Sequence, residues 1–141
     1  MTAYVGAVFV LFIKLVIVVA TQGVTRMRTR TFAYPEDAAH WSGEAVERES
    51  DLVVRAQRVL RNDGESQPFF LVFGGLYLVL GATPWAAWIY FPAYALARVA
   101  HTWFFLRPRQ PHRNRAFAVG LIVTAALALH CAVSALRPLF A

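Results

Sequence analysis

Residues 51–80 read DLVVRAQRVLRNDGESQPFFLVFGGLYLVL, and this stretch decides how the rest of the chain is interpreted. Its second half, residues 66–80, is apolar but shorter than the roughly 20 residues that a helix needs to cross a bilayer. A spanning helix must therefore include the charged half, residues 51–65. Charges at that depth are costly against lipid, so we expect them to face a bundle interior, pair with each other or line a watery cavity.

Apolar runs with at most one charge, Lys14, cover residues 1–25, 66–97 and 116–136. The middle run is too long for one helix and is interrupted at residues 81–84, where Thr83 can cap a new helix and Pro84 can occupy its first turn. The sequence therefore predicts an all-α, integral membrane four-helix bundle that forms one domain over residues 1–141. The predicted helices cover residues 4–28, 51–80, 84–106 and 113–138.

The composition is typical of a protein that is surrounded by lipid rather than water. Hydrophobic residues make up 58% of the chain and charged residues 16%, against about 45–50% and 25% in soluble domains. The net charge of +6 comes mostly from arginines at the ends of apolar runs, which favours membrane orientation and binding of a small anion over nucleic acid. The single cysteine, Cys131, cannot form an intrachain disulfide or a cysteine zinc site, and no metal is expected.

Arginine placement predicts the orientation. Arg26, Arg28 and Arg30 follow the first predicted helix, and Arg107, Arg109, Arg113 and Arg115 lie between the third and fourth. The positive-inside rule then places both basic loops in the cytoplasm and both termini outside. The first helix does not read as a signal peptide. A bacterial inner membrane and an endoplasmic reticulum both suit a multi-pass chain of this kind.

Polar side chains of three predicted helices gather toward the basic side. At about 100° per residue, one face of the second helix carries Arg55, Arg58, Asn62 and Glu65 within roughly 80°. A face of the third helix carries Arg98, His101, Thr102 and Phe105, and the fourth begins with His112, Arg113, Asn114 and Arg115. Together these groups predict a cationic pocket that contains one carboxylate and opens near the cytoplasmic surface.

A ligand for such a pocket should carry more than one anionic group for the arginines and an amine for Glu65. Glutathione fits, because it has two carboxylates, an ammonium group, two amides and a thiol. Arg113 and a helix N-terminus can lower the pKa of a bound thiol. Asn114 could donate a hydrogen bond to the sulfur or orient a second, lipophilic substrate that arrives from the lipid.

The run RVLRNDGE at residues 58–65, followed by Pro68 and Phe69, resembles the signature of the MAPEG family, membrane-associated proteins in eicosanoid and glutathione metabolism. The motifs FAYPED at residues 32–37 and RVAHT at residues 98–102 are similar to its prostaglandin-forming branch. The resemblance extends from Lys14 to about Phe117. It implies a homotrimer of four-helix subunits with glutathione, the expected cofactor, at the subunit interfaces.

The resemblance also implies roles for single residues. Glutathione-binding positions of the family are matched by Arg26, Arg58, Arg61, Asn62, Glu65 and His101, to which the shared face adds Arg98. Arg113 matches the arginine that stabilises the thiolate, and Asp37 matches an acidic residue of the prostaglandin site. The prostaglandin-forming branch has a serine at the position of Asn114 and glutathione-contacting tyrosines at the positions of Phe105 and Phe117. This chain therefore lacks those hydroxyl donors.

We therefore expect a glutathione-dependent transferase that conjugates a lipophilic electrophile, reduces a peroxide or isomerises an endoperoxide. The alternative is a non-catalytic membrane protein of the same fold that binds lipids or acts as a scaffold. Simpler interpretations of the single residues also stay open. Arg55, Arg58 and Arg61 could form a solvated helix end, Arg98 and His101 could join helices, Arg113 could be a membrane anchor, and Asp37 could be a loop or cap residue.

Overall fold

The computed structural model describes residues 1–137, and these residues are mostly helical. Four helices are long, and one is short. Their bounds are α1 (Thr2–Thr29), α2 (Pro35–His40), α3 (Asp51–Val79), α4 (Pro84–Leu106) and α5 (His112–Leu136). The fourth predicted helix was expected to reach residue 138, which lies outside the described residues. The start of α4 at Pro84 agrees with the turn chemistry of residues 81–84.

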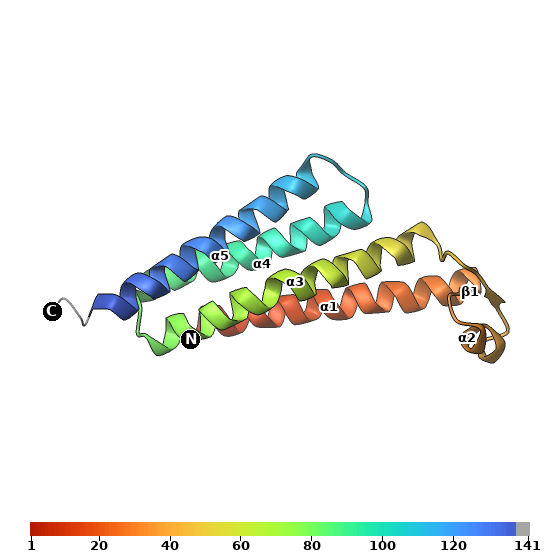
Figure 1. Ribbon diagram of the computed structural model, residues 1–141, viewed down its shortest axis with the longest axis horizontal. Coiled ribbons are helices and arrows are strands. Elements are labelled where there is room, and N and C mark those ends of the chain that lie inside the picture. Colours follow the sequence, from red (N-terminus) through yellow and green to blue (C-terminus); the bar gives the residue numbers. More distant parts are fainter. Residues whose placement is uncertain (138–141) are drawn as a thin grey trace.

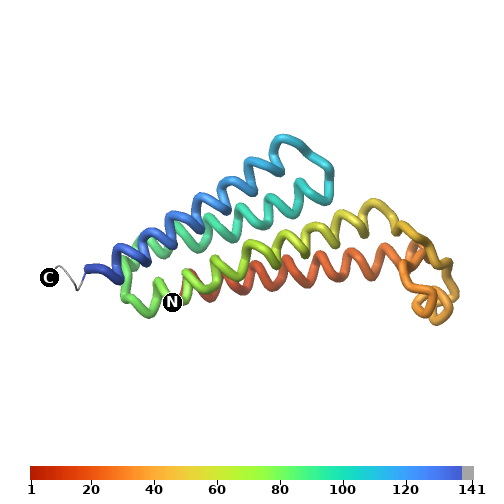
Figure 2. Tube along the Cα trace, viewed as in Figure 1, coloured from red at the N-terminus to blue at the C-terminus, as the bar shows by residue number. Residues whose placement is uncertain are grey.

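The long helices form two antiparallel pairs, α1 with α3 and α4 with α5 (Figure 1). Helix α4 packs on α1 as well as on α5, and α5 also contacts α3. The two pairs lie close together near the α3–α4 turn and diverge toward the α4–α5 loop, as the trace in Figure 2 shows. The basic segment that follows α1 and the basic α4–α5 loop lie toward the same end of the molecule.

The core near the α3–α4 turn is rich in aromatic residues. Phe70 and Tyr94 stack with ring centroids 3.7 Å apart and planes 7° from parallel, and Phe91 packs edge-on against Phe70. Helix α1 approaches α3 closely because Gly74 has no side chain: a Cβ there would lie 2.5 Å from Cε2 of Tyr4. Small residues at helix contacts are typical of bundles in lipid.

The connector at residues 30–50, which lies between the first two predicted helices, contains two short strands and a short helix. Strands β1 (Thr31–Phe32) and β2 (Glu44–Ala45) pair in parallel, and α2 lies between them in the chain, with Pro35 in its first turn. A Cβ at Gly43 would lie 2.5 Å from the carbonyl oxygen of Arg30, so only glycine allows this close approach. The connector forms a small lobe beyond the end of α1.

Two of the described helices, α1 and α5, are long and apolar enough to cross a membrane. Their outer faces expose many large apolar side chains, among them Phe9, Phe12, Ile17, Leu121, Ile122 and Leu129. Exposed apolar surface on this scale marks a membrane or a protein interface. Helix α3 is less apolar because its first half carries the charged residues discussed above.

Candidate functional site

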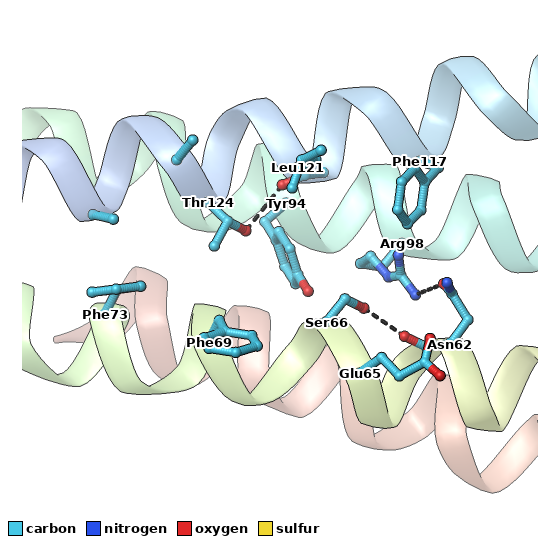
Figure 3. Close-up of a pocket in the computed structure, with 13 residues that line it drawn as sticks. Asn62, Glu65, Ser66, Phe69, Phe73, Tyr94, Arg98, Phe117, Leu121 and Thr124 are labelled. Carbon is cyan, nitrogen blue, oxygen red and sulfur yellow. Dashed lines mark hydrogen bonds between the residues drawn. The ribbon is translucent and has the colours of Figure 1, made fainter.

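A cavity of about 420 Å³ lies between α3, α4 and α5 (Figure 3). Its walls come from Asn62, Glu65, Ser66, Phe69, Phe73, Tyr94, Arg98, Phe117, Gly120, Leu121, Thr124, Ala125 and Ala128. One end is polar, where Asn62, Glu65 and Arg98 meet, and the remainder is mostly apolar. The cavity is thus less cationic than the sequence suggested, because Arg98 is the single cation in its lining among residues 1–137.

A buried ionic cluster joins three helices behind the polar end of the cavity. Nη2 of Arg98 donates hydrogen bonds to Oδ1 of Asn62 at 2.7 Å and to Oδ1 of Asp63 at 2.6 Å. Nζ of Lys14 donates to the other oxygen of Asp63 at 2.5 Å. Lys14, Asp63 and Arg98 are all buried, and the cluster has two cations for one carboxylate. Buried charges need such pairing, because removing them from water is costly.

The spacing of residues along the helices explains why the charged residues of the cluster lie on buried faces. Lys14 lies on the buried face of α1 between Leu11 and Val18, and Asp63 follows Val59 on the buried face of α3. Spacings of three and four residues put each charge on the face that meets the other helices. Asp63 was not among the predicted site residues. Its spacing from Val59 was the signal that could have identified it as an inward-facing carboxylate.

A second group brings together predicted site residues from α4 and α5. The guanidinium carbon of Arg113 lies 4.7 Å from the ring centroid of Phe105, which is within cation–π range. His101 lies edge-on to Phe105 at 5.5 Å and contacts Phe117 at 5.9 Å between centroids. Because Phe117 also lines the cavity, this group borders the polar end of the cavity.

Other predicted site residues are not brought to the cavity within this chain. Arg58 and Asn114 are exposed, and exposed Arg61 pairs with Glu65 along α3 at 3.3 Å. Asp37 lies in the first turn of α2, in the lobe. These residues stay predicted site residues, and the structure places them elsewhere on the surface of the single chain.

Arg26, another predicted glutathione ligand, forms an ion pair with a carboxylate of this chain. Its Nε and Nη2 donate to the two oxygens of Glu49 at 2.5 and 2.9 Å. Gln57 donates a further hydrogen bond to Glu49 at 2.9 Å. The hydrogen bonds from Arg26 are the main reason why the pKa of the buried Glu49 carboxyl lies below its usual range. Glu49 was not among the predicted site residues.

The sequence model of the MAPEG family matches residues 2–133 of this chain. The chain therefore belongs to the MAPEG family, whose members are membrane-associated. Among its relatives, human prostaglandin E synthase is 36% identical over 130 residues, which are 92% of this chain and 86% of that protein. The dog prostaglandin E synthase is 37% identical over 120 residues, covering 84% of this chain and 78% of that protein.

A second kind of relative is human microsomal glutathione S-transferase 1, which is 33% identical over 131 residues, covering 89% of this chain and 84% of that protein. Both kinds of relative are named as enzymes, and one is named for glutathione. The family resemblance seen in residues 58–65 is thereby confirmed, and it extends over nearly the whole chain. These relatives support a transferase or isomerase at the level of the family.

Proposed function

We propose that this chain is a glutathione-dependent membrane transferase that acts on a lipophilic electrophile or peroxide. In this proposal α1, α3, α4 and α5 each cross the bilayer, the subunits form a homotrimer, and the basic loops face the cytoplasm. The observation that carries the proposal is the cavity between α3, α4 and α5. One end of the cavity carries a cation, an amide and a carboxylate, and the rest is apolar. These two parts match a polar thiol cosubstrate and a lipophilic second substrate.

The polar end would hold glutathione. Arg98 can bind a carboxylate, Glu65 the ammonium group, and Asn62 an amide of the peptide. His101 and Phe117 border this end, and Arg113 lies beside them on Phe105. Arg113 would lower the pKa of the thiol by stabilising the thiolate. In a trimer, the exposed Arg58 and Arg61 and the paired Arg26 would contribute from a neighbouring subunit.

The apolar part of the cavity would hold the second substrate, which enters from lipid between α3 and α5. Its walls there come from Phe69, Phe73, Leu121, Ala125 and Ala128. A volume of about 420 Å³ lies within the usual range for small-molecule sites, about 300–1,000 Å³. Asn114 at the start of α5 and Asp37 in the lobe lie outside the cavity lining of this chain, so in this proposal they would reach the second substrate from a neighbouring subunit. Conjugation is the reaction proposed first, with peroxide reduction and endoperoxide isomerisation as variants.

Substituting Arg113 tests the proposal. In full-length protein held in lipid nanodiscs, Arg113→Ala should lower glutathione conjugation about a hundredfold, the cost of losing one group that stabilises developing charge. Arg115→Ala is the matched control, because Arg115 is an exposed neighbour on the same helix that does not line the cavity. Equal activity in both variants, with unchanged melting temperatures, would exclude Arg113 as the thiolate-stabilising group.

A second candidate function is a non-catalytic membrane protein of the same fold. The pairing of Arg26 with Glu49 and of Arg98 with Asp63 favours it, since two predicted glutathione ligands already have protein partners. Glutathione that raises the melting temperature while no electrophile is consumed would support this candidate. Stabilisation together with turnover would support the transferase.

A further inference from the structure

Lys14 carries a buried charge that pairing alone does not explain. It is the single charged side chain in the apolar run of residues 1–25, and it is buried on α1. Its Nζ donates a hydrogen bond to Oδ2 of Asp63 at 2.5 Å. Asp63, however, already accepts a hydrogen bond from Arg98 at 2.6 Å through its other oxygen. Because taking a second cation out of water is costly, the presence of Lys14 here needs an explanation.

The buried cluster keeps a surplus positive charge. Among residues 1–137 it consists of two cations and one carboxylate. All eight acidic side chains of the sequence lie in residues 36–65, so α1, α4 and α5 cannot supply a second carboxylate. Glu65, the carboxylate of the cavity lining, is largely exposed and pairs with Arg61. Ionisable residues buried in an apolar helix bundle commonly mark a ligand or ion site, and the ligand required here is an anion.

The surplus charge lies at the polar end of the cavity. Asn62 and Arg98 line the cavity at this end, and Nη2 of Arg98 joins them at 2.7 Å, as Figure 3 shows. Lys14 is not part of the lining and lies behind it, beyond Asp63. In a water-poor interior a charge acts over distances on the order of 10 Å. Lys14 can therefore influence a ligand that it does not touch.

The influence of Lys14 passes through Asp63. Without Lys14, Asp63 and Arg98 would form a pair with no net charge, and the polar end would attract anions only weakly. With Lys14, the carboxylate is compensated from the α1 side, and a positive charge remains toward the cavity. Glutathione carries two carboxylates and one ammonium group at neutral pH. Its single net negative charge is therefore equal and opposite to the surplus of the cluster.

We propose that Lys14 is a positioning residue that acts through Asp63 and makes the cavity selective for thiols of net negative charge. This inference deepens the proposed transferase function and rests on it. The thiol and the second substrate do not contact Lys14, so its charge sets the affinity for glutathione and has little effect on the reaction of bound glutathione. A thiol peptide without net charge gains little from this residue.

Calorimetric titration of glutathione into the full-length protein in nanodiscs measures the effect. Lys14→Met removes the charge and leaves Asp63 paired with Arg98. It should weaken glutathione binding about tenfold, at low and at high salt alike, because a buried charge is little screened. Lys14→Arg should bind glutathione as the wild type does. In an activity assay, Lys14→Met should raise KM for glutathione and leave kcat within about twofold.

Arg28→Met is the matched control. It removes a cation from an exposed position of the same helix, so any effect on glutathione binding should disappear at high salt. Glutathione monoethyl ester, which has no net charge, separates charge from shape. Lys14→Met should weaken binding of the ester less than binding of glutathione. If Lys14→Met does not fold, Lys14→Gln replaces it, because glutamine keeps a donor for Asp63 without the charge.

Each outcome has a distinct meaning. Equal weakening for glutathione and its ester, or equally weak binding by Lys14→Arg, would overturn the inference, because the side chain would then matter for its shape. Unchanged glutathione affinity in Lys14→Met would also overturn it and would leave the proposed transferase intact. Wild-type protein that binds no glutathione would overturn the proposed function and this inference with it.

Discussion

The same kinds of charged residue occur on α3 in two very different settings. Asp63 is paired with Lys14 and Arg98, and the three side chains are 7%, 4% and 1% exposed. Two residues away, Glu65 pairs with Arg61 at 3.3 Å, with side chains 63% and 84% exposed. Water screens the second pair but not the first, so the two should differ greatly in their effect on stability.

The buried cluster and the exposed pair differ in role. The buried cluster ties α1, α3 and α4 together and fixes Arg98 at the wall of the cavity. The exposed pair holds little structure together, so its residues stay free to exchange partners. We infer that fold stability depends on Asp63, whereas ligand recognition can use Arg61 and Glu65 at little structural cost.

Removing the buried carboxylate should have the largest effect. Asp63→Asn leaves two buried cations without an anion, and breaking a buried pair in this way costs about 3–5 kcal/mol. Asp51→Asn is the matched control, because this carboxylate on the same helix pairs with Arg48 while 73% exposed. Unfolding in detergent micelles, followed by helical circular dichroism, measures both. Equal stability of the two variants would contradict the role given to the cluster.

The pair of Arg26 and Glu49 should give an intermediate effect that depends on pH. The pKa of Glu49 is lowered by the hydrogen bonds from Arg26, so its contribution is fully present above the usual glutamate pKa of about 4.3. The contribution is lost as the pH falls from there through the lowered pKa of the folded state. It should amount to about 1.5 kcal/mol, as for hydrogen bonds to charged groups.

Glu49→Gln provides the measurement for this pair. Its free energy of unfolding should be lower than that of the wild type at neutral pH, and the difference should shrink in acid. Comparing the two proteins removes the titration of the other carboxylates. A difference that stays constant from neutral to acid pH would show that ionisation of Glu49 does not stabilise the fold.

Breaking the exposed pair should have the smallest effect. Arg61→Ala should change stability by no more than about 0.5 kcal/mol, because water screens this pair. If Arg61 contributes to glutathione binding, the same variant should raise KM for glutathione and leave kcat nearly unchanged. A melting temperature as low as that of Asp63→Asn would contradict the contrast between the two regions.

The helices could be located from sequence because local signals mark them. The predicted ranges 51–80 and 84–106 compare with Asp51–Val79 and Pro84–Leu106 in the structure, since a turn at Gly81 and a proline in the first turn of α4 define the break between them, without a side-chain cap from Thr83. The family could also be predicted from the sequence, because the resemblance depends on a contiguous motif. The ordered lobe was missed because its two-residue strands depend on pairing across the connector rather than on a local pattern.

The buried face of α3 was not recognised from the sequence, although the four-residue spacing of Val59 and Asp63 marks it. The polar stripe grouped Asn62 with Arg58 and Glu65, but Asp63 turns inward because its partners, Lys14 and Arg98, lie on two other helices. Tyr94 was missed for a similar reason. Its place in the cavity wall depends on its stacking against Phe70 of α3, and such a contact is not encoded in any one segment.

We propose that the cavity binds glutathione as a thiolate beside Arg113. Calorimetric titration of glutathione into the nanodisc-held protein, in two buffers with different ionisation enthalpies, measures both binding and proton release. Because an ordinary cysteine thiol has a pKa of about 8.5, binding as a thiolate near neutral pH must release a proton. We expect saturable binding with proton release in the wild type, and loss of the release in Arg113→Ala. Binding without proton release, or no saturable binding, would contradict it.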